Sequence, residues 1–339
     1  MKVVIIQTAF IGDVILCTSM IEALKAAGHE ISVTVKPEAA ALFVNDDRLQ
    51  NIHVFDKRGA DKGLTGILAM GRNFEKSGYD AAVIPHRSLR SALIAWLGKI
   101  PCRIGFHRSA GRFLMTDVIG YNKSIHEVKR NHSLLGPLGV TSPEPAPCVR
   151  VTDEDRFAVR EWFKKWNIEE SDVLVGIGPG SQWFTKQWGI ERYRKLLELY
   201  AEKKHGKVLC FGGPDERQLC ESICSAASLY SVNTAGIFSL KQSAAALEKM
   251  RVVVTNDNGL MHLAGAVNTP VIAIFGPTIP GFGFAPWGDR HTVIERELYC
   301  RPCSIHGTKS CPEGHFRCMR EISPESLMQT VEDYIDKPA

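Results

Sequence analysis

Short apolar runs alternate with segments of helical periodicity along most of the chain. The first run is Lys2–Gln7, apolar residues then recur at helical spacing from about Asp13 to Ala27, and the next apolar run is Ile31–Val35. A strand, a helix and a second strand in this order form a βαβ unit with parallel strands. The pattern therefore predicts an α/β fold, in which helices cover both faces of a parallel sheet.

The same alternation extends through both halves of the chain. Short runs of β-branched residues predict strands, and apolar residues at a spacing of three or four predict helices. In the first half it predicts strands at Asn51–Phe55, Ala81–Ile84, Arg103–Phe106 and Asp117–Gly120, and helices at Leu64–Lys76 and Leu89–Leu97. In the second half it predicts helices at Asp153–Trp166, Ile190–Lys204, Asp215–Ala226 and Leu240–Glu248, and strands at Val173–Ile177 and Val208–Phe211. Each half thus has its own α/β series.

A proline-rich segment separates the two series. Residues 141–151 read TSPEPAPCVRV, a composition that is typical of an interdomain linker. Because 339 residues are many for a single core, we expect two domains. Their expected bounds are 1–150 and 151–322, and residues 323–339 are expected to form a helix that packs back on the first domain.

The segment Arg251–Thr278 contains a further βαβ unit. The strand Val252–Val254 leads through polar residues into a short helix that ends near Val267, and a second strand follows at Val271–Phe275. In open α/β sheets, ligands bind at the loop that follows such a strand. The polar residues 255–259 are therefore the leading candidates for a binding site.

This polar loop suits a diphosphate. The start of its helix offers unpaired N–H groups and a partial positive charge. Asp257 or Asn258 can cap the helix, Gly259 lets a ligand approach the backbone, and His262 lies about one turn further on. Taken singly, the acid and the amide are only caps and the histidine is only structural. Together, within six positions, the four residue types favour a binding site.

The segment Val175–Trp188, VGIGPGSQWFTKQW, joins a strand to a helix through three glycines. Its spacing is not that of a dinucleotide fingerprint, and it lacks the Gly-Lys-Ser or Gly-Lys-Thr of a Walker A loop. It offers backbone amides, Ser181, Gln182 and one cation, Lys186. Lys186 is either an ordinary exposed lysine or a charge that neutralises a leaving phosphate.

Acids follow two other predicted strands. Asp13 comes after the first strand in the sequence IGD, and from spacing alone it is the N-cap of its helix, a role worth about 1 kcal/mol. It could also accept a proton from an attacking hydroxyl late in a reaction. In FGGPDE, at 211–216, Asp215 or Glu216 could hold a ribose hydroxyl, or could only cap a helix.

A cysteine-rich segment lies near the end of the chain, at Tyr299–Met319. It contains one C-x-x-C pair but not a second, so two interpretations stay open. The segment either holds a structural zinc ion or packs as a loop through its small cysteines and glycines. Its candidate ligands are Cys300, Cys303, Cys311 and Cys318, with His306 and His315 nearby.

Composition is ordinary for a globular protein, with 45% hydrophobic and 23% charged residues, which argues against disorder. The N-terminal apolar run stops at Gln7, too early for a signal-peptide core, and no segment approaches the roughly 20 apolar residues of a spanning helix. We therefore expect a cytoplasmic protein, whose ten cysteines are free thiols or metal ligands.

Positive charge is concentrated in the first half, since residues 1–150 carry a net charge of +6 and the remainder −2. Within 86–130 there are nine basic side chains and two acidic ones. This excess indicates either an anionic partner or a solvated basic face. The basic residues are Arg87, Arg90, Lys99, Arg103, Arg108, Arg112, Lys123, Lys129 and Arg130.

Taken together, four segments in this order resemble the ADP-heptose:lipopolysaccharide heptosyltransferases of glycosyltransferase family 9. The likeness covers essentially the whole chain, and the cysteine segment is similar to that of members like heptosyltransferase II. The resemblance implies a GT-B fold, with two facing Rossmann-like domains, parallel sheets and a central cleft. The segments are IIQTAFIGDVILCTSMIEAL, SLRSALIAWLGKIPCRIGF, GPGSQWFTKQWGIERY and NDNGLMHLAGAVNTPVIAIFGPT.

The resemblance also implies roles for individual residues. Asp13 matches the catalytic base, and Lys186 matches the lysine that binds the donor phosphates. The other residues that match the donor pocket are Ser181, Gln182, Asp215, Asp257, Asn258, Gly259 and His262. Asn258 replaces the usual hydroxyl residue, and Phe10 stands where many members have a small residue.

The implied reaction is an inverting transfer of heptose from ADP-L-glycero-β-D-manno-heptose to the lipopolysaccharide inner core. It implies an acceptor-binding domain 1–150, a donor-binding domain from 151 and no required metal. Arg87, Arg90 and Arg108 would meet the anionic acceptor at the inner face of the inner membrane, and no nucleic acid is involved. The alternatives are a GT-B nucleotide-sugar epimerase or hydrolase, or a non-catalytic nucleotide- or zinc-binding protein.

Overall fold

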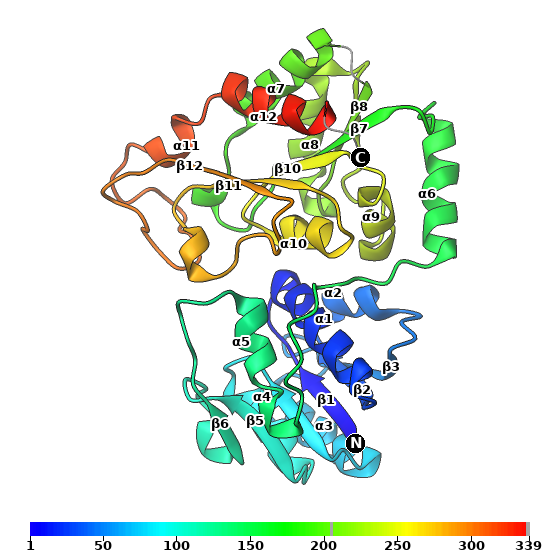
Figure 1. Cartoon of the computed structure of the whole chain (residues 1–339), viewed down its shortest axis with the longest axis vertical. Helices are drawn as coiled ribbons and strands as arrows, with labels where there is room; N and C mark the ends of the chain where they lie inside the picture. Colours follow the sequence, from blue (N-terminus) through cyan, green and yellow to red (C-terminus); the bar gives the residue numbers. More distant parts are fainter. Residues whose placement is uncertain (204–205, 337–339) are drawn as a thin grey trace. The chain divides into compact units, whose positions relative to one another are not determined.

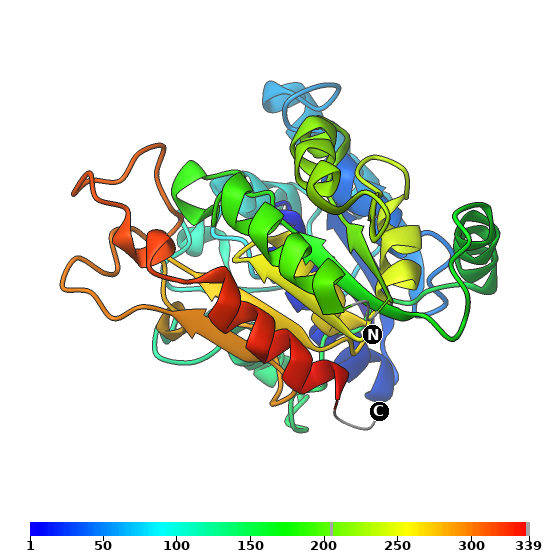
Figure 2. The same cartoon turned by 90° about the horizontal axis from the view of Figure 1, so that it is seen from above.

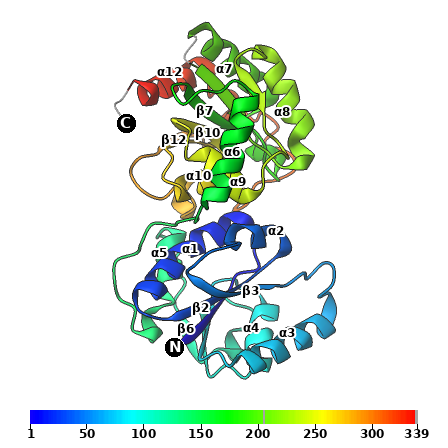
Figure 3. The same ribbon diagram turned by 90° about the vertical axis from the view of Figure 1, so that its right-hand side faces the viewer.

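The computed structural model describes residues 1–203 and 206–336. It divides into two compact units, Met1–Arg150 and Val151–Ala339, and the division falls within the proline-rich segment. Figure 1 labels the elements of both units, and Figure 2 and Figure 3 show them from two other directions. Among the described residues, no helix is both long enough and apolar enough to cross a bilayer.

The first unit is built on a six-stranded parallel sheet with the order β3-β2-β1-β4-β5-β6. Its apolar strands are buried on both faces because helices cover both. The helix α3 packs beside α4 on one face, whereas α1 packs beside α5 on the other (Figure 3). The strands are β1 (Lys2–Ile6), β2 (Glu30–Val35), β3 (Leu49–Val54), β4 (Ala81–Ile84), β5 (Cys102–Phe106) and β6 (Asp117–Ile119), and the helices are α1 (Ile11–Ala26), α2 (Pro37–Ala40), α3 (Gly63–Ser77), α4 (Leu89–Leu97) and α5 (Glu127–Ser133).

The second unit repeats this topology, with the order β12-β11-β10-β7-β8-β9. Counted from its first strand, the order is the same as in the first unit, so the predicted pair of Rossmann-like domains is confirmed. The predicted end of a helix at Lys204 lies outside the described residues. The strands are β7 (Val173–Gly178), β8 (Gly206–Cys210), β9 (Ser231–Asn233), β10 (Val252–Asn256), β11 (Val271–Phe275) and β12 (Thr292–Glu295), and the helices are α6 (Asp153–Lys165), α7 (Ile190–Lys203), α8 (Arg217–Cys224), α9 (Leu240–Leu247), α10 (Gly259–Ala266), α11 (Arg317–Arg320) and α12 (Pro324–Ile335).

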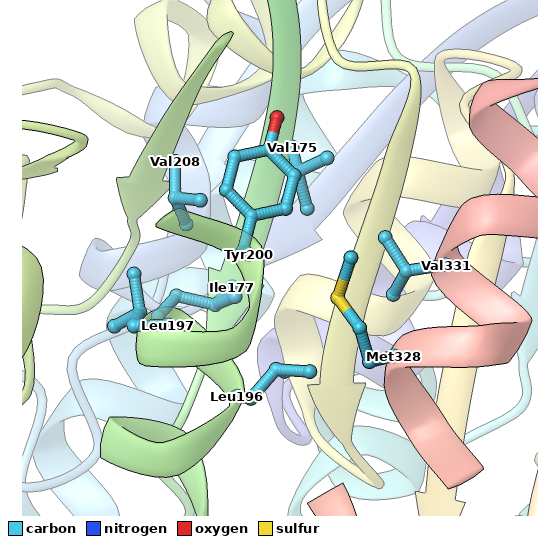
Figure 4. Close-up of a pocket in the computed structure, with 8 residues that line it drawn as sticks. All are labelled: Val175, Ile177, Leu196, Leu197, Tyr200, Val208, Met328 and Val331. Atoms are coloured by element: carbon cyan, nitrogen blue, oxygen red, sulfur yellow. The ribbon is translucent and has the colours of Figure 1, made fainter. Parts of the chain in front are cut away.

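The last helix, α12, packs within the second unit, beside α7 and against β10 (Figure 2). Its buried Leu327, Met328 and Val331 belong to the core cluster of that unit. The apolar face of α12 is therefore used within its own unit, whereas the expectation that residues 323–339 pack back on the first domain stays a prediction, and residues 337–339 lie outside the described residues. Figure 4 shows a small apolar cavity of about 10 Å³ at this junction, lined by side chains of α7, α12, β7 and β8. It is a packing gap in the core.

Candidate functional site

In each sheet, strand order reverses between two neighbouring strands, β1 and β4 in the first unit and β7 and β10 in the second. The loops at the carboxyl ends of such a pair diverge to opposite faces, which leaves room for a ligand. Asp13 follows β1, the glycine-containing segment follows β7, and Asp257 follows β10. The residues selected from the sequence therefore lie at the two reversal points.

Asn258 connects the two loops of the second unit. It is the N-cap of α10, and its Oδ1 accepts hydrogen bonds from the backbone N–H groups of Leu260 and Met261, at 2.9 and 3.2 Å. Its Nδ2 donates to the carbonyl oxygen of Gly180 at 2.8 Å. One amide side chain thus satisfies the first turn of α10 and fixes it to the loop after β7.

Two glycines of the loop are required by close approaches. A Cβ atom on Gly178 would lie 2.6 Å from Oγ1 of Thr255 and 2.4 Å from a methyl carbon of Leu260. A Cβ atom on Gly180 would lie 1.7 Å from a carboxylate oxygen of Glu216. The buried backbone at Gly178 and Gly180 is therefore packed closely against the side chains of β10, α10 and Glu216, and a larger residue would require these side chains to move.

Lys186 and Asp257 form an ion pair beside the start of α10. Lys186 Nζ lies 2.6 Å from Asp257 Oδ2, and the two side chains are only 13% and 10% exposed. The hydroxyl of Thr278 donates to the same carboxylate oxygen at 2.7 Å. The ammonium group is therefore held at one point beside the start of α10, next to the carboxylate that partly balances its charge.

The other predicted residues of this loop differ in exposure. Ser181 is half-buried, and its hydroxyl accepts a hydrogen bond from the N–H of Trp183 at 3.4 Å, whereas Gln182 is exposed. Gly259 is the first residue of α10, and His262 is buried one turn into it. All four lie on the two loops that Asn258 connects or within the first turns of α10.

Of the two acids in FGGPDE, Glu216 and not Asp215 lies against the loop after β7. The 3-10 turn Pro214–Glu216 precedes α8 and directs Glu216 against Gly180, where it also accepts the N–H of Gly213 at 2.9 Å. Asp215 is exposed. The sequence could not choose between these neighbours, because the choice depends on how the turn is oriented.

The cysteine-rich segment packs against the Lys186 turn. Thr185 and Thr308 exchange hydrogen bonds at 2.8 and 2.9 Å, and the N–H of Cys303 donates to the carbonyl oxygen of Pro277 at 2.9 Å. Cys318 is buried in the core of the unit. Among the described residues, no three His, Cys, Asp or Glu side chains are grouped as metal ligands. The zinc interpretation thus gains no support here, whereas the packing interpretation has named contacts.

Asp13 is not the N-cap of its helix, which corrects the expectation from spacing. The helix begins at Ile11 after the N-cap Phe10, and Asp13 is the third helical residue. Its half-buried carboxylate accepts the N–H of Phe10 at 3.2 Å. Burial is the largest cause that raises the pKa of Asp13, to about 6, and the negative charge of Glu127 is the second. The positive charges of Arg87 and Lys36 act in the opposite direction.

Other polar groups line the same edge of the first sheet. Nδ1 of His86, after β4, lies 3.0 Å from the hydroxyl of Thr8, after β1. Burial, followed by the charge of Lys57, lowers the pKa of His86 to about 4, so its imidazole is neutral at pH 7. Lys57 itself donates to the carbonyl oxygen of Thr8 at 3.0 Å. Lys36 and Lys57 are not among the residues predicted from the sequence, although both follow predicted strands and could have been found by that position.

The predicted basic surface is smaller than the sequence suggested. Arg87, Arg90 and Arg108 are exposed, and the guanidinium groups of Arg87 and Arg108 lie 5.0 and 5.9 Å from the ring centre of Tyr121. Arg130, by contrast, is buried in an ion pair with Glu127. Arg103 is half-buried and donates from Nε to the carbonyl oxygen of Leu114 at 2.7 Å. These two arginines therefore stabilise the fold and do not belong to an anion-binding face.

Comparison with known proteins identifies relatives along the whole chain. The family described as "Glycosyltransferase family 9 (heptosyltransferase)" matches residues 67–314. Lipooligosaccharide heptosyltransferase 2 of Haemophilus ducreyi is 26% identical over 97% of this chain and 98% of that protein. Lipopolysaccharide heptosyltransferase 2 of Escherichia coli K12 is 24% identical over 97% of each chain.

Solved structures share the fold. A family 9 glycosyltransferase from Veillonella parvula superposes with a TM-score of 0.88 at 22% identity, over 98% of this chain and 97% of that one. ADP-heptose lps heptosyltransferase II of E. coli has a TM-score of 0.82 at 22% identity, over 99% and 98%. A UDP-GlcNAc 2-epimerase from Methanocaldococcus jannaschii has a TM-score of 0.55 at 12% identity, over 99% and 93%. Fold likeness alone thus extends to an epimerase, whereas the family match does not.

Proposed function

The chain belongs to glycosyltransferase family 9, and we propose that it transfers heptose from ADP-L-glycero-β-D-manno-heptose to the inner core of lipopolysaccharide, with inversion at the anomeric carbon. The observation that carries this proposal is the fixed Lys186 ammonium beside the N-terminus of α10. A diphosphate leaving group needs positive charge where its own negative charge develops, and this corner supplies it. The heptosyltransferase relatives favour this reaction over an epimerase or hydrolase.

We assign donor binding to the second unit. In this proposal Lys186 and the positive end of the α10 helix dipole attract the two phosphates of the donor. Ser181, Gln182, Asn258, Gly259 and His262 line the pocket, and Asp257 holds Lys186 in place. Glu216 replaces Asp215 as the residue that binds a ribose hydroxyl, because it faces the glycine loop whereas Asp215 is exposed.

We assign acceptor binding and the base to the first unit. The acceptor oxygen forms a bond to the anomeric carbon, Asp13 takes the proton of that hydroxyl, and ADP leaves with the electrons of the broken C–O bond. A pKa of about 6 leaves Asp13 ionised at pH 7, yet makes it a better base than an ordinary aspartate. Arg87, Arg90 and Arg108 supply positive charge for an anionic acceptor.

In this proposal the protein needs no metal for transfer, since Lys186 and the α10 N-terminus supply the positive charge at the leaving group. Zinc at Cys300, Cys303, Cys311 and Cys318 stays a separate hypothesis, and elemental analysis of the purified protein tests it.

The reaction is tested by incubating the protein with a panel of nucleotide sugars and a truncated inner-core acceptor, followed by mass spectrometry of the acceptor. We expect one heptose to be added, only from the ADP-heptose donor and only when the acceptor is present. Release of free sugar at the same rate without acceptor would instead establish a hydrolase. Conversion of the donor into an isomer of equal mass would establish an epimerase.

We further propose that the first unit contacts the cytoplasmic face of the inner membrane, where a lipid-linked acceptor resides. Leu64 and Phe113 are each 73% exposed, and Leu89 is 39% exposed. Leu64 and Leu89 begin the adjacent helices α3 and α4, and Leu89 packs against Gly111, two residues before Phe113. Exposed cations lie close to these side chains in the sequence, which suits an anionic bilayer surface. They are Arg58, Lys62, Arg90 and Arg112.

The double variant Leu64→Ser with Phe113→Ser should weaken binding to anionic lipid vesicles about tenfold, because two apolar side chains no longer enter the bilayer. Co-sedimentation with phosphatidylglycerol-containing vesicles measures this. Leu229→Ser is the matched control, since Leu229 is 79% exposed in the second unit. An equal loss in this control, or no vesicle binding by the unmodified protein, would refute the membrane contact.

A further inference from the structure

A buried ion pair lies at the start of α5. Glu127 Oε2 and Arg130 Nε are 2.5 Å apart, and both side chains are almost completely buried. Nη1 of Arg130 also donates to the carbonyl oxygens of residues 122, 123 and 125, at 3.3, 3.3 and 2.7 Å. The pair therefore ties the loop between β6 and α5 to the first turn of α5, and it stabilises a carboxylate where water is largely absent.

The helix that carries this carboxylate, α5, packs against α1, and both helices begin at the carboxyl edge of the same parallel sheet. Nδ2 of Asn131 lies 3.6 Å from Sγ of Cys17. Cys17 is one turn beyond Asp13 on its helix, and Asn131 is one turn beyond Glu127, so the two carboxylates occupy matching first turns of neighbouring helices.

We propose that Glu127, fixed by Arg130, is a positioning residue that places a second negative charge beside Asp13 and so keeps Asp13 a stronger base for the transfer reaction. This inference rests on the proposed role of Asp13. A nearby negative charge makes loss of the Asp13 proton less favourable, and the same charge makes uptake of a proton from the acceptor hydroxyl more favourable. Glu127 itself is buried and paired, so it does not touch the substrate.

The groups that face Asp13 come from several elements. Glu127 of α5 raises its pKa, after burial as the largest cause, whereas the N–H of Phe10, Arg87 after β4 and Lys36 after β2 lower it. Cys17 of α1 and Tyr121 after β6 are neutral neighbours whose own pKa values Asp13 raises. Among these causes Glu127 is the negative charge, so its removal should lower the pKa of Asp13. Asp13 would then be a weaker base.

The test is Glu127→Gln, which keeps the shape of the side chain and removes its charge. The acidic limb of the kcat/KM profile, expected near pH 6 in the unmodified protein, should move to lower pH by roughly half a unit or more. The plateau should fall a few-fold, because a weaker base accepts the proton less readily. Glu127→Asp retains the charge and should keep the limb close to its original position.

A carbon-13 titration of the aspartate carboxyl groups provides a readout that needs no turnover. The carboxyl resonance that is absent from the spectrum of Asp13→Asn belongs to Asp13. In Glu127→Gln, the midpoint of the titration of this resonance should move to lower pH. If that variant does not fold, Glu127→Gln with Arg130→Met removes both charges of the pair, a change that buried ion pairs often tolerate. A smaller downward move is then expected, because loss of the Arg130 charge acts on Asp13 in the opposite direction to loss of the Glu127 charge.

Different results would overturn the role of Asp13 as the base and the role of Glu127 as a positioning residue. Retained transfer by Asp13→Asn would remove the base and thus the proposed mechanism. An inactive Asp13→Asn together with an unmoved midpoint and an unmoved acidic limb in Glu127→Gln would leave the mechanism intact and overturn the positioning role. In that case Glu127 serves only to neutralise Arg130.

Discussion

Asp13→Asn should lower kcat for heptose transfer by about 10²–10⁴-fold, the usual contribution of a general base, while ADP binds as tightly as before. The amide is the same size as the carboxylate, and its oxygen can still accept the N–H of Phe10, so α1 should keep its first turn. What is lost is the ability to take a proton from the acceptor hydroxyl. Single-turnover transfer and calorimetric titration with ADP measure the two quantities separately.

Asp47→Asn is a suitable control for this substitution. Asp47 is an exposed aspartate in the same unit, and the same chemical change there should leave transfer unaffected. If Asp13→Asn transfers heptose at a rate within a few-fold of the unmodified protein, Asp13 is not the base. If ADP affinity falls together with transfer, the substitution has disturbed more than the proton transfer.

Lys186→Ala should slow transfer by about 10²–10³-fold, comparable to removal of one preorganised group that stabilises developing charge, and it should weaken ADP binding. The loss has two parts. The ammonium group no longer neutralises the leaving diphosphate, and the carboxylate of Asp257 stays behind without its partner at 2.6 Å. That carboxylate then repels the phosphates.

Adding Asp257→Asn to Lys186→Ala should therefore recover part of the ADP affinity, so that the two substitutions are not additive. Adenosine, which lacks phosphates, should bind all these variants equally. Lys164→Ala is the control, since Lys164 forms an exposed ion pair with Glu161 at 2.6 Å in the same unit. An equal loss of adenosine and ADP binding in Lys186→Ala would mean that Lys186 supports the pocket and does not contact the phosphates.

The elements with a clear apolar pattern were predicted well from the sequence. The predicted strand Ala81–Ile84 and helix Leu89–Leu97 have the bounds of β4 and α4. Both contain apolar residues that a core-facing element needs, so local pattern and tertiary environment agree. The fold class followed from the order of such elements.

The helix α5 was missed for a physical reason. Its sequence, EVKRNHS, is almost entirely polar, yet five of its seven residues are buried. The ion pair of Glu127 with Arg130 and the contact of Asn131 with Cys17 replace the apolar stripe that sequence patterns detect. The edge strands β9 and β12, which are three and four residues long, were also missed.

The sequence identified residues of the candidate site, but it did not predict the contacts between them. The sequence placed Asp257 and Lys186 on separate loops, but their ion pair joins positions 71 residues apart and depends on the pairing of β7 with β10. Thr278, which donates to Asp257, gave no signal of its own. The choice of Glu216 over Asp215 likewise depends on the orientation of one turn. Such pairings arise from the sheet topology, which the sequence pattern specifies only in outline.

The proposed reaction is a single displacement, in which an acceptor hydroxyl deprotonated by Asp13 attacks the donor directly. NMR of the purified product reads the configuration at the anomeric carbon of the transferred heptose. Starting from the β-configured donor, a single displacement gives an α-linked heptose. A β-linked product would rule this reaction out, because retention requires either two displacements through a covalent intermediate or attack from the same face as the leaving ADP.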